Sequence, residues 1–236
     1  MEGYTLGHTA RDPQSREAKA NKIIKVLGQH RDLSTARVLD IGTGAGLIAN
    51  ALSKHAKAVD SIDIVDDRTT TEGYTQTLVT DERIPFPDGT FDVVITNQVL
   101  EHVPDAALHL KEIRRVLADD GVVYLATPNK WWLTDPHYKL PFISWLPRPV
   151  AGQYLKVTKH KKWDIYSVSL PTLENLAAGA GFTVEDETMT VMLAPEAYDV
   201  KFPEPATAVL KKLPGGVRRI LLYVVPTHIK VLAPKR

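Results

Sequence analysis

A short apolar run that breaks into three closely spaced glycines is the feature that most constrains the fold of this chain. Val38, Leu39 and Ile41 give the pattern of a strand that is buried on both faces. Residues 42–46 then read G-T-G-A-G, and glycine lets the backbone turn sharply and present bare amide groups to a ligand. We therefore expect a buried strand, a ligand-binding turn, and a helix that begins near residue 45.

The spacing of these glycines indicates which ligand the turn serves. A dinucleotide fingerprint, G-x-G-x-x-G, would need its third glycine at residue 47, where this chain has Leu47. The observed run, preceded by Asp40, resembles the first motif of the class I S-adenosylmethionine (SAM) dependent methyltransferases. The block IPFPDGTFDVVITNQVLEHV at residues 84–103 is similar to the methyltransferase family often called type 11. The resemblance covers roughly residues 37–129.

Strand and helix patterns alternate along the chain. Strands are expected at 59–64, 75–80, 93–96, 122–126, 182–191 and 229–232, and helices at 13–29, 45–55, 105–117 and 171–180. This alternation predicts an α/β fold with a mostly parallel sheet covered on both faces. The resemblance implies a Rossmann-like, doubly wound class I methyltransferase fold. We expect a single domain over residues 1–236, with a SAM-binding core at about 30–129.

Two segments do not follow the alternation, at about 130–168 and 195–228, the second with short helices near 206–213 and 217–224. The first contains all four tryptophans, and its residues 130–165 hold seven cations and two acids. Long irregular segments in compact domains are usually functional, and this one follows a strand end where open α/β sheets bind ligands. We expect both segments to be cap insertions that build an acceptor pocket. The tryptophans would either form a hydrophobic plug or stack on the ligand.

The resemblance implies which residues bind the methionine part of SAM. Gly42, Gly44 and Gly46 would let the backbone approach it closely. Asp40 would bind the ammonium group, directly or through water, and Asn97 would lie beside the methionine portion.

The resemblance also implies which acids bind the adenosine part. Asp63, at the tip of the second strand, would accept both ribose hydroxyl groups, because a carboxylate has two acceptor oxygens. Either Asp81 or Glu82 would accept the adenine amino group.

Two histidines are candidates for a general base. A sulfonium methyl group is already activated, so the protein mainly aligns donor and acceptor and removes a proton where needed. His102 and His137 are placed for that role, because imidazole titrates near neutral pH; the alternative is that each only packs. Similar ubiquinone-type O-methyltransferases carry Glu-x-x-Glu-His, which can hold a divalent ion. Here Gln98 replaces the first acid, so we expect no metal site.

Composition narrows the remaining possibilities. The net charge is +1, the chain has no Cys, and no apolar run reaches membrane-spanning length, which together lead us to expect a cytoplasmic enzyme without disulfides. Nucleic-acid methylation is not expected, because the fourth strand is not followed by (Asn/Asp)-Pro-Pro-(Tyr/Phe) and the overall charge is near neutral. Peripheral membrane contact through the basic pairs at 211–212 and 218–219 is a weaker alternative.

These features together predict SAM-dependent methyl transfer, with S-adenosylhomocysteine as the product. The expected acceptor is a small or lipid- or sugar-linked molecule with an anionic group, and oxygen is the favoured atom. The alternatives are an N- or C-methyltransferase acting on a small molecule, and a non-catalytic SAM-binding module. A nicotinamide-dependent oxidoreductase is disfavoured by Leu47.

Overall fold

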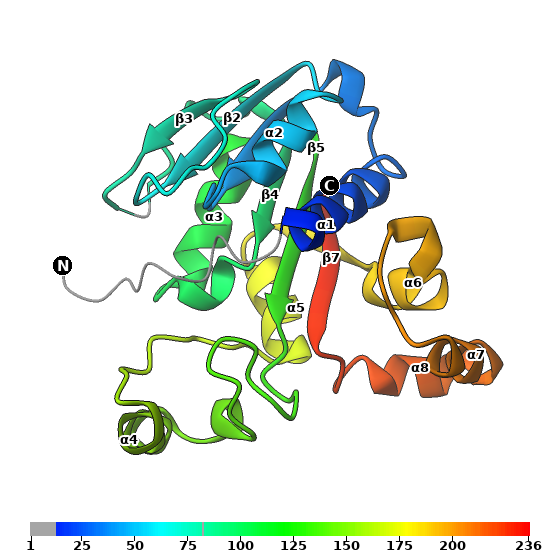
Figure 1. Cartoon of the computed structure of the whole chain (residues 1–236). Coiled ribbons are helices and arrows are strands. Elements are labelled where there is room, and N and C mark those ends of the chain that lie inside the picture. The colour runs from blue at the N-terminus through cyan, green and yellow to red at the C-terminus, as the bar shows by residue number, and fades with distance from the viewer. Residues whose placement is uncertain (1–12, 82) are drawn as a thin grey trace.

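A seven-stranded sheet forms the centre of the computed structural model, which describes residues 13–81 and 83–236 (Figure 1). The strands are β1 (Arg37–Ile41), β2 (Ala58–Asp63), β3 (Thr75–Leu78), β4 (Phe91–Asn97), β5 (Leu117–Pro128), β6 (Phe182–Asp186) and β7 (Thr227–Pro234). Their order is β3-β2-β1-β4-β5-β7-β6. β3, β2, β1, β4 and β5 are parallel, whereas β7 runs antiparallel to β5 and to β6. The predicted mostly parallel α/β sheet is confirmed.

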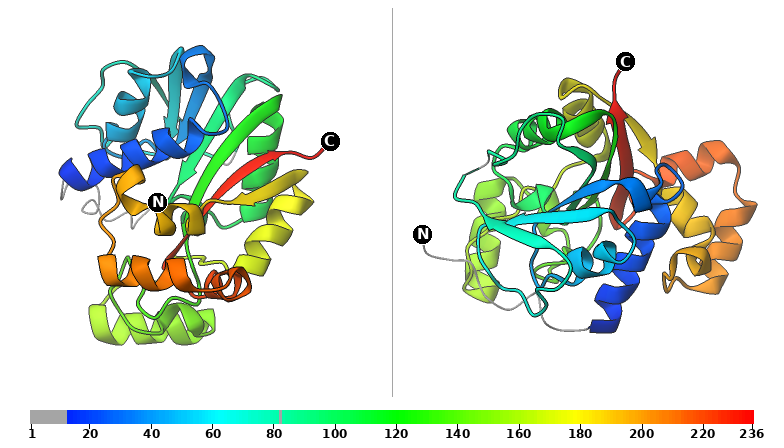
Figure 2. Two further views of the ribbon diagram at one scale, coloured as in Figure 1. Left: turned by 90° about the vertical axis from the view of Figure 1, so that its right-hand side faces the viewer. Right: turned by 90° about the horizontal axis from the view of Figure 1, so that it is seen from above.

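Helices cover both faces of this sheet (Figures 1 and 2). The α-helices are α1 (Pro13–Leu27), α2 (Leu47–Ser53), α3 (Ala106–Val116), α4 (Arg148–Lys159), α5 (Leu170–Gly179), α6 (Thr188–Leu193), α7 (Glu204–Lys212) and α8 (Gly215–Leu221). Short 3₁₀ turns lie at η1 (Leu33–Thr35), η2 (Leu100–His102), η3 (Ile143–Trp145) and η4 (Pro195–Tyr198). One core cluster packs α3 and α5 against the sheet, and another packs α1, α2 and α6 against its opposite face.

β1 shows why the apolar run and the glycines form this local structure. Leu39 belongs to the core cluster under α3 and α5, whereas Val38 belongs to the cluster under α1 and α2. Both side chains are fully buried, as a strand covered on two faces requires. Gly46 then caps α2 with a φ of 79°, and a side chain there would collide with the hydroxyl of Tyr74. Because this left-handed residue ends the turn, α2 begins at Leu47 and not near residue 45 as predicted.

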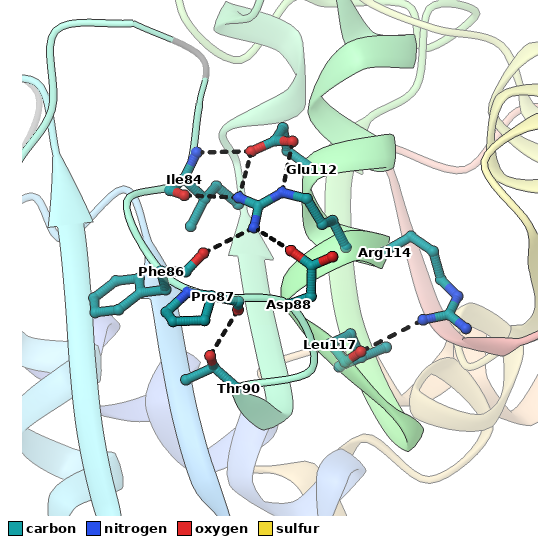
Figure 3. Close-up of polar contacts among 9 residues, drawn as sticks. Ile84, Phe86, Pro87, Asp88, Thr90, Glu112, Arg114 and Leu117 are labelled. Atoms are coloured by element: carbon teal, nitrogen blue, oxygen red, sulfur yellow. Dashed lines mark hydrogen bonds and ion pairs between the residues drawn. The ribbon is translucent and has the colours of Figure 1, made fainter.

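The block at residues 84–90 is held in place by α3 (Figure 3). The guanidinium group of Arg115 donates to the backbone oxygens of Ile84 and Phe86, at 2.8 Å each, and to Asp88 Oδ1. Glu112 Oε2 accepts from the backbone N–H of Ile84 at 3.0 Å and from Arg115 at 2.7 Å. The Pro- and Gly-containing turn is therefore part of the scaffold, and it fixes the position of Ile84.

Three differences from the predicted elements exceed a shift of three residues at one end. The expected strand over 182–191 ends at Asp186, and α6 follows, because Met189 and Met192 pack on one apolar cluster while Val191 packs on another. α4 was expected to be irregular because Pro147 and Pro149 precede or open it, but proline is tolerated in the first helical turn. β5 begins at Leu117, directly after α3, and not at residue 122 as predicted.

The two cap segments lie at one end of the molecule, beyond the carboxyl ends of β4 and β5 (Figures 1 and 2). The first contains α4, and the second contains α7 and α8. Asn129, directly after β5, is buried and donates through Nδ2 to the backbone oxygens of Tyr223 and Val225, at 2.9 Å each. Asn129 thus links the two segments. Among residues 13–81 and 83–236, no helix combines the length and the apolar character needed to cross a bilayer.

Candidate functional site

A cavity of about 820 Å³ opens at the carboxyl ends of the parallel strands. One wall comes from the ends of β1, β2, β3 and β4, and the other comes from residues 136–138, 161 and 164–165 of the first cap segment. Ligand sites in open α/β sheets are expected at this edge, and cavities of this size hold cofactor-sized ligands. The cavity therefore joins the predicted donor-binding turn to the predicted acceptor side.

Asp63 and the glycine turn line the part of the cavity that is predicted to bind the donor. Asp63 Oδ2 accepts from the backbone N–H of Gly44 at 2.8 Å, and Oδ1 accepts from that of Ile64 at 2.7 Å. Gly42 and Gly44 line the cavity with positive φ angles of 81° and 50°. A side chain on Gly42 would overlap the side chain of Val99. The backbone thus faces the cavity at these two glycines, whereas Gly46 does not line the cavity and serves the packing of the turn.

Asp40 is buried behind the glycine turn and does not line the cavity. Burial and the nearby carboxylate of Asp63 raise the pKa of Asp40 well above its usual value. Its Oδ2 atom has no hydrogen-bond partner within the part of the chain that the structure describes. An ammonium group or a bridging water would satisfy this oxygen, so the residue fits the role that the resemblance implies.

The remaining donor-side residues lie on the wall formed by β3 and β4. Asn97 lines the cavity at the end of β4. Thr80 and Asp81 line it after β3, and Asp81 is exposed and accepts from the backbone N–H of Arg83 at 2.9 Å. Glu82 lies outside the described residues. Asp81 thus lies at the cavity wall, and its contact with the adenine amino group stays a prediction.

His102 and His137 line another part of the cavity wall, and Glu101 lies beside them. Glu101 is fully buried, and burial raises its pKa to about 7. Its Oε2 accepts from the Thr127 hydroxyl at 3.0 Å, and its Oε1 lies 3.7 Å from His137 Nε2. The rings of His102 and His137 pack edge to face, with centroids 5.0 Å apart. The structure therefore brings the two predicted base candidates together, although 35 positions separate them in the sequence.

A second carboxylate lies behind His137. Asp135 is buried, and its Oδ1 accepts from the backbone N–H groups of His137 and Tyr138, at 2.9 and 2.8 Å. The same oxygen lies 3.9 Å from His137 Nδ1. Burial would lower the pKa of His137, but the carboxylates of Asp135 and Glu101 outweigh this effect and raise it. A proton on His137 is therefore stabilised from both sides of the ring.

Several residues of this part of the site were not selected from the sequence. Asp135, Tyr138 and Lys161 come from the cap, and the only sequence signal was Asp135 two residues before His137, the spacing of an Asx turn. His109 also lines the cavity; its Nε2 lies 3.2 Å from the Thr96 hydroxyl. Burial lowers the pKa of His109 to about 4, so its ring is neutral. The sequence pattern of α3 does not distinguish His109 from the residues of this helix that only pack in the core.

Two parts of the cap that were expected to build the acceptor pocket do not line this cavity. None of the four tryptophans lines this cavity: Trp131, Trp132 and Trp145 are 36–41% exposed, and Trp163 packs below α4. Among the basic residues of the first cap segment, Lys161 lines the cavity. The second cap segment, 195–228, does not line it and supports the first segment through Asn129. The sequence does not indicate which part of the cap folds over the carboxyl ends of the strands.

The same cluster bears on the question of a metal ion. One ligand atom each from Glu101, His102 and His137 lies within 4.8 Å of the others. Gln98, at the position where an acid would complete the Glu-x-x-Glu-His pattern, lines the cavity with a φ of 59°. A carboxylate and two imidazoles can hold a divalent ion, but the amide of Gln98 brings no charge. The absence of a metal therefore stays a prediction.

Comparisons with known proteins identify the family. A family model described as a methyltransferase domain matches residues 13–187. The chain is 34% identical over 184 residues to the ubiquinone biosynthesis O-methyltransferase of Neisseria meningitidis, covering 72% of this chain and 73% of that protein. It is 28% identical over 181 residues to the mitochondrial ubiquinone biosynthesis O-methyltransferase of Bos taurus, covering 70% of this chain and 47% of that protein. The chain spans about half the length of several curated relatives that it matches.

A solved structure shows the same fold. The SAM-dependent methyltransferase of Mesorhizobium loti superimposes with a TM-score of 0.57 at 14% identity, covering 95% of this chain and 99% of that one. The sheet order, the glycine turn at the end of β1 and Asp63 at the end of β2 are the features that the sequence resemblance implied. The chain belongs to the class I SAM-dependent methyltransferases.

Proposed function

We propose that this chain transfers the methyl group of SAM to a hydroxyl oxygen of a small or lipid- or sugar-linked acceptor. The observation that carries the proposal is one cavity lined both by Asp63 and the glycine turn and by His102 and His137, with Glu101 buried beside His137. The names of the relatives, ubiquinone biosynthesis O-methyltransferases, support oxygen as the methylated atom.

The residues of the chain supply alignment and a proton acceptor. SAM supplies a methyl group that is already activated by its positive sulfur. The cavity walls hold the two reactants in line and exclude water. As the oxygen–carbon bond forms and the carbon–sulfur bond breaks, the hydroxyl proton moves to the imidazole of His137 or His102, and neutral S-adenosylhomocysteine leaves. The carboxylates of Glu101 and Asp135 stabilise the imidazolium.

The charge of the cap supports an acceptor that carries an anionic group. Residues 130–165 hold seven cations and two acids, and Lys161 from this segment lines the cavity. Ile220 and Tyr223 are exposed in and directly after α8, and Arg218 and Arg219 precede them in the sequence. Apolar and basic side chains in one segment support the weaker alternative that the chain contacts the surface of a membrane that holds a lipid-linked acceptor.

The proposal is tested by following both products. The purified chain is incubated with methyl-labelled SAM and a panel of phenolic and sugar hydroxyl acceptors, and S-adenosylhomocysteine and the labelled acceptor are measured by mass spectrometry. We expect label on a hydroxyl oxygen and an equal amount of S-adenosylhomocysteine. Binding of SAM without turnover on any acceptor would instead identify a non-catalytic binding module, and label on nitrogen or carbon would contradict O-methylation. Tight binding of NAD without binding of SAM would contradict the assignment of the cavity to SAM.

Turnover is expected to survive treatment with EDTA, because Gln98 adds no negative charge to the Glu101–His102 pair. Rates before and after chelation, with and without added magnesium, check this. Gln98→Glu is the matched variant, and its added charge should create binding of a divalent ion that the wild type lacks. If EDTA abolishes wild-type activity and magnesium restores it, Glu101, His102 and His137 act as metal ligands.

A further inference from the structure

A second pocket, of about 510 Å³, lies between α4 and the chain that follows it. Its wall contains five basic side chains and one aromatic ring: Arg148, Lys156, His160, Lys161, Lys162 and Trp163. No carboxylate lines it. Pockets on protein surfaces usually mix charges of both signs, so a wall with four permanent cations and no acid favours a multivalent anion.

The local backbone explains how this pocket forms. His160 ends α4 in a left-handed conformation, with a φ of 55°, so the chain turns back and places residues 161–163 beside the helix. Gly152 faces the Cβ atom of Trp163 from α4, and Trp163 is 8% exposed. A glycine at this point of the helix leaves room that a larger side chain would occupy.

The three lysines of this pocket are not held in ion pairs with any residue that the structure describes. Within residues 13–81 and 83–236, no carboxylate forms an ion pair with Lys156, Lys161 or Lys162, whereas several arginines of the SAM-binding half are paired. Arg148 is held by the backbone oxygen of Ile165 at 2.9 Å and stacks on the ring of Tyr166 at 3.9 Å. The negative end of the α4 dipole offsets about half a charge, against four permanent positive charges. The pocket therefore keeps a strong positive potential.

Lys161 connects this pocket with the reaction cavity, because its side chain lines both. We infer that the α4 pocket binds a phosphate or diphosphate group of the acceptor while the acceptor hydroxyl lies at Glu101, His102 and His137. This inference rests on the proposed function. It places the anionic group of the acceptor in the α4 pocket, and it gives the basic side chains of the first cap segment a role in binding phosphate.

Direct binding of inorganic pyrophosphate to the whole chain tests this assignment. Calorimetry should show saturable binding to the wild type, and the double variant Lys156→Gln/Lys162→Gln should raise the dissociation constant at least about tenfold, because two of four permanent cations are lost. Lys159→Gln is the matched control, since Lys159 is an exposed cation of the same helix outside the pocket. It should change the constant less than about twofold. Absence of pyrophosphate binding, or equal binding by the double variant and the control, would overturn the assignment.

Two further experiments show whether the phosphate that binds belongs to the acceptor or to a lipid headgroup. They also separate this inference from the proposed function. Vesicles of phosphatidylglycerol should not displace pyrophosphate; displacement would assign the pocket to a lipid headgroup and overturn its assignment to the acceptor. With a phosphorylated acceptor, the double variant should raise KM with little change in kcat, whereas an unchanged KM would also overturn it. S-adenosylhomocysteine affinity is measured in every variant. If it is retained while pyrophosphate does not bind, only the inference about the α4 pocket fails.

Discussion

His137→Ala is expected to lower kcat by roughly 10²–10⁴-fold, the usual contribution of a general base, while SAM affinity stays nearly unchanged. His137 combines cavity exposure with two flanking carboxylates, Asp135 and Glu101. Neither carboxylate belongs to the predicted donor-binding part of the cavity, lined by Asp63 and the glycine turn, so the variant separates catalysis from donor binding. Single-turnover rates and calorimetry with SAM measure the two quantities.

The pH dependence of kcat distinguishes His137 from its neighbour His102. His137 accepts a proton only when neutral, and its pKa is raised, so kcat should increase with pH through a value above the ordinary histidine pKa. Asp135→Asn keeps an oxygen that can accept from the backbone N–H groups of His137 and Tyr138 but removes the charge. Asp135→Asn should therefore lower the pKa of His137 and move the rise of kcat to lower pH.

His102→Ala is the paired variant, because His102 packs against His137 within the same cavity. A large loss in His102→Ala with an unshifted profile in Asp135→Asn would assign the base to His102. If neither histidine variant slows turnover more than about tenfold, neither histidine is the base. Alignment alone, or an acceptor that is already ionised, would then account for the reaction.

The SAM-binding half was predictable because its signals are local. Val38 and Leu39 face opposite sides of the sheet, which is what a continuous apolar run in a parallel strand means. Asp63 lies beside the glycine turn because the carboxyl ends of neighbouring parallel strands meet at one edge. Both relations follow from the order of neighbouring strands and from short turns, which the sequence pattern predicts.

The acceptor side could be predicted only in part. His137 was selected by residue type, but its contact with Glu101 depends on how the first cap segment folds back over the sheet, and no local pattern encodes that path. Proline near α4 suggested irregular chain, although its missing N–H is harmless in a first helical turn. Tryptophan suggested either ligand stacking or a hydrophobic plug. Trp131 and Trp145 instead pack on each other at the surface, whereas Trp163 packs in an apolar cluster with α4.

Asp63→Ala is expected to weaken SAM binding by about 1.5–3 kcal/mol, or roughly 10- to 150-fold in the dissociation constant, the usual range for hydrogen bonds to a charged group. The predicted role of Asp63 is to accept the ribose hydroxyl groups. Its carboxylate also accepts from the backbone N–H of Gly44, so the same substitution loosens the turn that contacts the methionine part. Both effects weaken donor binding, and calorimetry with SAM and S-adenosylhomocysteine measures their sum.

Two further variants separate the ribose contact from the support of the turn. Asp63→Asn removes the charge but keeps one oxygen that can accept from Gly44, so it should weaken SAM binding less than alanine does. Asp60→Ala is the matched control, because Asp60 is an acid of the same strand that pairs with Arg37 at 2.9 Å and does not line the cavity. It should leave SAM affinity unchanged while lowering the melting temperature slightly. A change of less than about threefold in the SAM dissociation constant of a folded Asp63→Ala variant is below the smallest loss expected for such contacts. That result would remove Asp63 from the donor site, and with it the assignment of the β2 tip to the ribose.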